Sequence, residues 1–207
     1  MNRKVRVSHE VLSSRTARPP TQYLDLVADA LSDITQPYFM LATTYEPSGI
    51  VRERVFCYEL YHKMRLKLGN DSRLSLNGEI DKRGHVDFEP GDQKNPDFVF
   101  HIPGTHEGNT IAMEVKGRID RPANIVADFR TLLTFCKKYS YQAGLFALYN
   151  HTLNELARAI RRGLPLLASQ PFAARIHIMA IQRAGDKPER TTLAELATRG
   201  AQPDRAA

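Results

Sequence analysis

Hydrophobic residues recur along the chain at two spacings, and each spacing predicts one kind of secondary structure. Apolar residues three and four positions apart are typical of a helix with one buried face, whereas alternation of apolar and polar residues is typical of a half-buried strand. These patterns predict helices at about 21–34, 49–68, 122–138 and 153–167, and strands at 74–81, 97–102, 109–117, 143–149 and 174–181. The order of the elements predicts a three-layer α/β domain, in which helices cover both faces of a central mixed sheet.

The chain divides into three segments. A length of 207 residues suits one domain with a sizeable core, which we place at residues 21–183. Residues 1–20 hold five basic residues and one acid and end in two prolines, so they are predicted to form a basic N-terminal arm. Residues 184–207 are polar and are predicted to form a C-terminal tail with one short helix at about 192–197.

The composition favours a soluble, folded protein. Hydrophobic residues make up 42% and charged residues 25% of the chain, and no run reaches the roughly 20 apolar residues that a membrane helix needs. We therefore expect a cytoplasmic protein without a membrane partner. Lys and Arg number 29 against 23 acids, a net charge of +6 that favours polyanionic partners such as nucleic acid. Many basic enzymes have other substrates, so charge alone does not decide the function.

Three charged residues lie on two neighbouring predicted strands. Asp97 begins one strand, and Glu114 and Lys116 end the next. Because side chains alternate along a strand, Glu114 and Lys116 leave the same face. If the two strands pair across the loop at 103–108, Asp97 comes beside Glu114. The pattern therefore predicts two carboxylates and a lysine at one place.

Two carboxylates that converge repel each other unless a cation lies between them or one is protonated. A divalent metal is the simpler solution. The carboxylates of Asp97 and Glu114 with the carbonyl oxygen of Val115 form an oxygen-only ligand set that suits Mg²⁺ or Mn²⁺. Lys116 would then act either as a base with a lowered pKa or as a fixed positive charge, and the sequence leaves both roles open. The chain has only two cysteines, which excludes a cysteine-rich zinc site.

A purely structural interpretation of the same residues is also available. Glu114 and Lys116 could form a surface pair on one strand, and Asp97 could cap a turn after Pro96. The apolar residues around Glu114 weigh against the surface pair, because an unpaired charge in such surroundings is costly. His101 shares a strand face with Asp97, but we interpret it as a hydrogen-bonded structural histidine.

Pro96-Asp97 and Glu114-Val115-Lys116 resemble the motif of the PD-(D/E)xK nuclease superfamily, which has the restriction-endonuclease-like fold. The phrases ERVFCYELYHKMR, GEIDK, PDFVFH and AMEVKG resemble a stand-alone prokaryotic branch, of which some members are linked to defence. The resemblance covers about residues 49–149. It implies that Asp97 and Glu114 bind a metal and that Lys116 is the catalytic lysine.

Two further carboxylates are candidates for the same site. Glu53 lies four residues before Cys57, on the helix stripe that we expect to be buried (Cys57, Leu60, Tyr61 and Met64). Many members of the family use a glutamate from this helix, although an acid in the first turn of a helix can also simply favour the dipole. Glu79 lies on the polar face of the first predicted strand and is either a site residue or a solvated carboxylate.

These observations predict a Mg²⁺-dependent nuclease that hydrolyses phosphodiester bonds in DNA, in defence or repair. Arg158, Arg161 and Arg162 lie opposite the apolar stripe of their helix and could contact phosphates. Cutting both strands of a duplex would favour a homodimer, since one site cuts one strand. The alternatives are a non-catalytic DNA-binding or interaction module that keeps the fold and, less favoured, a nuclease that acts on RNA.

Overall fold

The computed structural model of the chain describes residues 19–69, 74–78, 95–102 and 108–200. Short apolar runs form its strands, and longer segments with one apolar face form its helices. The elements are, in chain order, α1 (Pro20–Ser32), α2 (Gln36–Phe39), α3 (Glu53–Leu68), β1 (Ser75–Gly78), β2 (Phe98–His101), β3 (Ile111–Lys116), α4 (Pro122–Lys138), β4 (Ala143–Tyr149), α5 (Leu153–Ala159), α6 (Leu164–Ala168), a 3₁₀ turn (Ala173–Arg175), β5 (Ile176–Ile181), β6 (Glu189–Thr192) and α7 (Leu193–Gly200).

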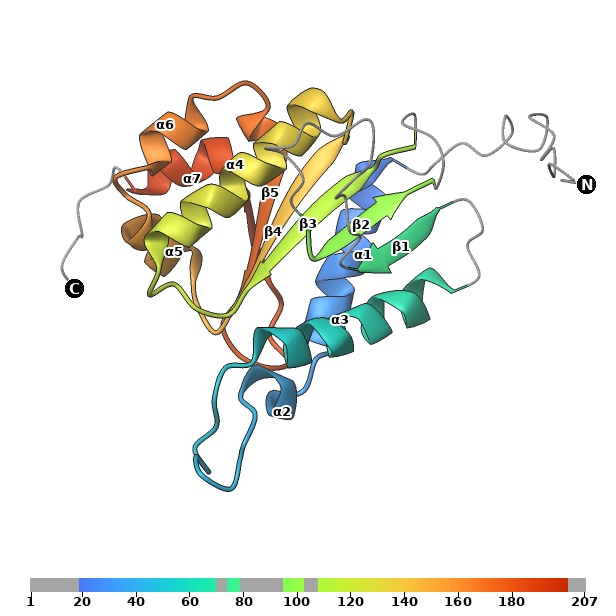
Figure 1. The fold of residues 1–207 in the computed structure, drawn as a ribbon, viewed down its shortest axis with the longest axis vertical. Helices are drawn as coiled ribbons and strands as arrows, with labels where there is room; N and C mark the ends of the chain where they lie inside the picture. The colour runs from blue at the N-terminus through green and yellow to red at the C-terminus, as the bar shows by residue number, and fades with distance from the viewer. Residues whose placement is uncertain (1–18, 70–73, 79–94, 103–107, 201–207) are drawn as a thin grey trace, which may run out of the picture.

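The strands form one mixed sheet in the order β1-β2-β3-β4-β5-β6 (Figure 1). The first three strands are antiparallel neighbours in chain order. β3, β4 and β5 run parallel, and β6 returns antiparallel to β5. Every residue of β4 is buried, which agrees with its continuous apolar sequence and its central place in the sheet.

Helices cover both faces of the sheet, so the predicted three-layer α/β architecture is confirmed (Figure 1). On one face α1 and α3 pack on alternate residues of β3, among them Met113 and Val115. On the other face α4, α5, α6 and α7 pack on a second set that includes Ala112 and Phe146. Glu114 and Lys116 of β3 therefore belong to the face that α4 covers.

Two predicted helices differ in detail from those of the structure. The helix expected from residue 49 begins at Glu53 and buries Phe56, Leu60, Met64 and Leu68, whereas Cys57 is only partly buried. The helix expected at 153–167 is two helices, α5 and α6. Pro165 explains the break, because a proline inside a continuous helix would lack the N–H and clash with the preceding turn.

The C-terminal boundary at residue 183 was wrong. Residues 189–200 form β6 and α7, and Leu193 and Leu196 of α7 are fully buried. The short helix expected at 192–197 is thus part of the domain. The predicted basic arm lies almost entirely outside the described residues, and Pro20 already belongs to α1. Within the described ranges, none of the helices is long and apolar enough to cross a membrane.

Candidate functional site

The candidate site lies where β3 ends, and the pairing of β2 with β3 brings its first two carboxyl groups together. Phe98 is opposite Met113 in this antiparallel ladder, so the next position places Asp97 opposite Glu114. Residues opposite each other in a ladder point to the same face. The register that the sequence analysis had to assume is therefore the one observed.

Asp97 and Glu114 form a buried pair of carboxyl groups. The Glu114 side chain is hydrogen-bonded to that of Asp97, and Asp97 Oδ2 also accepts a hydrogen bond of 2.7 Å from the Val115 N–H. Burial raises the pKa of Asp97 to about 6, and the Val115 hydrogen bond opposes this shift only in part. Burial, followed by the charge of Asp97, raises the pKa of Glu114 well above its usual value. Without a cation, at least one of the two carboxyls therefore tends to hold a proton.

The burial of Glu114 decides between the two interpretations of the strand pair. Only 7% of Glu114 is exposed, so it is not part of a solvated surface pair. A carboxyl group in such a position needs partners that compensate for the loss of water. Asp97 is such a partner when one of the two carboxyls is protonated, and its own bond to the Val115 N–H reaches across to β3 rather than capping a turn within its own segment.

Lys116 lies between carboxylates from two helices. Its Nζ is 3.1 Å from Glu53 Oε1 of α3 and 3.5 Å from Asp128 Oδ2 of α4. The same ammonium donates to the carbonyl oxygen of Val115 at 3.2 Å. Burial disfavours the charged form of Lys116, but the carboxylates of Asp128 and Glu53 outweigh it and hold the pKa of the ammonium above its usual value. In this arrangement the side chain of Lys116 carries a positive charge.

Glu53 reaches the site from the first residue of α3. Its Oε1 accepts from Lys116, and its Oε2 accepts from the backbone N–H of Gly117 at 3.3 Å. Glu53 is an acid of the first helical turn and also contacts Lys116, and its role as a further ligand of a metal or water stays a prediction. A side chain at position 117 would overlap the ring of Tyr149, since a Cβ there would lie 2.2 Å from Tyr149 Cζ. The glycine thus allows the strand end to pass under a buried ring.

Asp128 is the site residue that the sequence analysis missed. It lies on α4, three residues after Ile125 and four before Leu132, both of which are buried. That spacing places Asp128 at the flank of the buried face, where an acid needs a cationic partner. An acid within an otherwise apolar helical stripe was the available signal, and only the packing of α4 on β3 shows that Lys116 is the partner.

Two other candidates have different outcomes. Glu79 lies outside the described residues, so its role stays a prediction. His101 Nε2 is 3.0 Å from Asn77 Oδ1 on the neighbouring strand β1, as expected of a structural histidine.

The site offers oxygen donors to a cation. In the part of the chain that the structure describes, no group of three or more His, Cys, Asp or Glu side chains is placed to hold a metal ion. The ligand set predicted from the sequence contains only two such side chains, since it combines the carboxylates of Asp97 and Glu114 with the Val115 carbonyl. Two buried carboxyls with raised pKa values fit a divalent cation, which would let both ionise.

Comparisons with protein-family models, with curated proteins and with solved structures find no match to this chain.

Proposed function

We propose that the protein is a metal-dependent nuclease that hydrolyses phosphodiester bonds in DNA. The observation that carries this proposal is the buried Asp97–Glu114 pair with the ammonium of Lys116 beside it at the end of β3. The order of these residues along the chain, PD followed by ExK, resembles the PD-(D/E)xK nucleases. The net charge of +6 is compatible with a polyanionic substrate.

The carboxylates of Asp97 and Glu114 and the carbonyl oxygen of Val115 would hold Mg²⁺ or Mn²⁺. All three donors are hard oxygens, the type of ligand that both ions prefer. Once bound, the ion supplies polarisation of the phosphoryl group and a water of lowered pKa. The carbonyl oxygen has two lone pairs, so it can accept from Lys116 and still face a cation.

Lys116 would stabilise the negative charge that develops on the phosphate. Glu53 of α3 and Asp128 of α4 hold the Lys116 ammonium from opposite faces of the sheet. These two contacts fix the position of the ammonium before the substrate arrives. A preorganised charge in a partly buried site stabilises a transition state more than the same charge in water. The raised pKa of Lys116 favours this role over that of a general base.

Cleavage of plasmid, linear and single-stranded DNA in Mg²⁺, Mn²⁺ or EDTA tests the proposal. We expect cleavage only with a divalent ion and its loss in Glu114→Gln and in Lys116→Met. The matched controls are Glu59→Gln and Lys63→Met, because Glu59 and Lys63 form a comparable ion pair of 3.2 Å on α3. These two variants should cut like the unmodified protein.

Two results would contradict the proposal. Cleavage that survives in EDTA or in Glu114→Gln would exclude the metal-dependent site. DNA binding without cleavage under every condition would favour the non-catalytic module instead. An RNA oligonucleotide of the same sequence tests the substrate, since cleavage of RNA alone would exclude DNA as the target.

A further inference from the structure

A groove lined by arginines lies on the α4 face of the sheet, beside the beginning of α4. Its volume is about 460 Å³, and it lies between Pro122 and Ala123 of α4 and the three arginines Arg158, Arg161 and Arg162 at the end of α5. Gly163 brings the two walls together, because a Cβ there would lie only 3.0 Å from Val126 of α4. The groove is thus built by direct packing of α4 against the α5–α6 turn.

Two of the three arginines of this groove carry charge that is not compensated locally. Arg161 and Arg162 are exposed, and neither forms an ion pair with any residue that the structure describes. The first turn of α4 contains no acid, and its N-terminus has no side-chain cap. The positive end of the helix dipole therefore adds to the field of the arginines.

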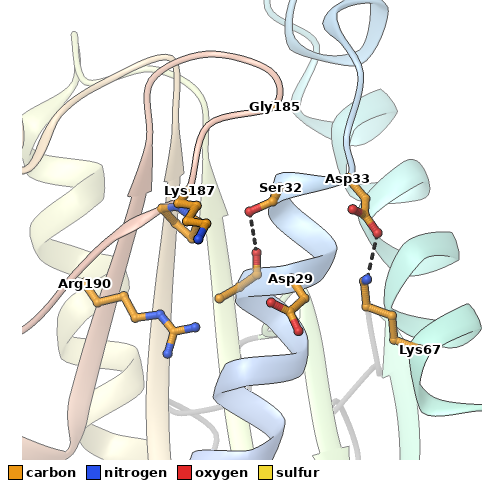
Figure 2. A pocket seen from close by; sticks show the side chains of 9 residues that line it. Asp29, Ser32, Asp33, Lys67, Gly185, Lys187 and Arg190 are labelled. Atoms are coloured by element: carbon orange, nitrogen blue, oxygen red, sulfur yellow. Dashed lines mark hydrogen bonds and ion pairs between the residues drawn. The ribbon is translucent and has the colours of Figure 1, made fainter.

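A second groove, of about 600 Å³, lies over α1 and α3 and serves as a contrast (Figure 2). Two of the three cations that line it form ion pairs: Lys67 Nζ is 2.7 Å from Asp33, and Arg190, which projects beside α1, is 2.5 Å from Asp25. Charge is therefore largely neutralised in that groove. Of these two grooves, the one at α4 presents two neighbouring arginines, Arg161 and Arg162, that have no acid partner among the described residues.

The arginine groove and the candidate site share one helix. Asp128, which holds Lys116, follows Pro122 by six positions on α4. Six helical residues span about 9 Å along the helix axis at roughly 1.5 Å each. At this separation the groove and the candidate site can contact the same DNA molecule.

We propose that this groove binds phosphates of the DNA that occupies the candidate site. The choice of ligand rests on the proposed nuclease function. Arginine suits this task because its planar fork donates two parallel hydrogen bonds to a phosphate. The groove would hold the strand in register without reading its sequence, since contacts to phosphates carry no base information.

Binding of a 30-nucleotide duplex in EDTA, measured by fluorescence anisotropy from 50 to 200 mM salt, tests the groove apart from cleavage. Each phosphate contact contributes about 0.9 to the slope of log K against log salt. We therefore expect Arg161→Ala/Arg162→Ala to lower the magnitude of this slope by about 1.8. The increase from 50 to 200 mM salt then weakens DNA binding of the variant by a factor that is about tenfold smaller than for the unmodified protein. The control, Lys187→Ala/Arg190→Ala, removes the same charge from the second groove and should keep the slope.

An unchanged slope in Arg161→Ala/Arg162→Ala would overturn the proposal, as would an equal loss in the control or no binding by the unmodified protein. Thermal melting establishes that both double variants are folded. If the protein binds with the expected slopes but never cuts DNA in Mg²⁺, the nuclease proposal fails while the groove stands.

Discussion

Glu114 is the residue on which the interpretation of the site depends. A buried glutamate on a central strand costs free energy unless its surroundings provide partners or a function. Here the adjacent carboxyl of Asp97 makes the cost greater without a cation, because two acids disfavour each other's charge. Such a pair, destabilised in its ionised form, is typical of a site that a ligand completes.

The raised pKa of Asp97 predicts how the metal-free protein responds to pH. An unfolded aspartate titrates at about 3.9, whereas the pKa in the folded protein is about 6. The folded state therefore keeps a proton that the unfolded state has released, so the contribution of Asp97 to stability is greatest below pH 4 and is lost as the pH rises to 6. We expect a loss of up to about 3 kcal/mol across this range.

Urea unfolding in EDTA at pH 4, 5, 6 and 7 measures this loss for the unmodified protein and for Asp97→Asn. The difference between the two curves gives the contribution of the coupled Asp97–Glu114 pair, separate from distant groups that titrate. The free energy of unfolding of Asp97→Asn should depend less on pH than that of the unmodified protein. Asp29→Asn, which changes an exposed residue, should follow the unmodified protein. Parallel curves for the unmodified protein and Asp97→Asn would contradict the assignment.

Strand alternation and helical spacing explain why so much of the secondary structure follows from the sequence. Alternation alone places Glu114 and Lys116 on one face of β3, which the packing of Met113 and Val115 on the other face confirms. The break between α5 and α6 shows the limit of apolar spacing, since the stripe continues while Pro165 interrupts the backbone. Hydrophobic pattern and backbone hydrogen bonding must therefore be considered together.

Helix α4 is predicted to contribute to activity through Asp128. Asp128→Asn removes one of the two carboxylates that hold the Lys116 ammonium, so that its position becomes less defined. Loss of such an orienting partner typically costs about 10- to 100-fold in activity. We expect kcat for DNA cleavage to fall by this factor while KM stays unchanged.

Steady-state cleavage kinetics in Mg²⁺ separate the two parameters. Asp33→Asn is the matched control, because Asp33 forms an ion pair with Lys67 on the opposite face of the sheet. A change in KM alone would show that Asp128 acts on substrate binding and not through Lys116.

Residues 189–200 belong to the folded domain, although their polar composition predicted that they are part of a C-terminal tail. β6 buries only Thr191 of its four residues, so an edge strand of this kind leaves almost no hydrophobic pattern. Its membership in the sheet depends on pairing with β5, and α7 then covers the sheet with Leu193 and Leu196. Neither contact can be read from the segment alone.

Truncation distinguishes the domain boundary predicted at residue 183 from the boundary observed after α7. Removal of residues 184–207 deletes β6 and α7 and exposes the apolar face beneath them, so we expect loss of cooperative thermal unfolding by circular dichroism. Removal of residues 201–207 alone should leave the melting temperature within a few degrees. Leu196→Ala, which creates a cavity in the full chain, should cost about 2–5 kcal/mol. A stable, cooperatively folded chain of residues 1–183 would contradict the role of β6 and α7.

Local pattern was sufficient to predict the layers, the central strands and the shared face of Glu114 and Lys116, because alternation and helical spacing depend only on neighbouring residues. The tertiary structure decided which distant groups meet. Glu53 and Asp128 reach Lys116 from helices on opposite faces, and Asp97 reaches Glu114 through the register of two strands. Those distances depend on how whole elements pack, and packing is a property of the assembled core that no single segment contains.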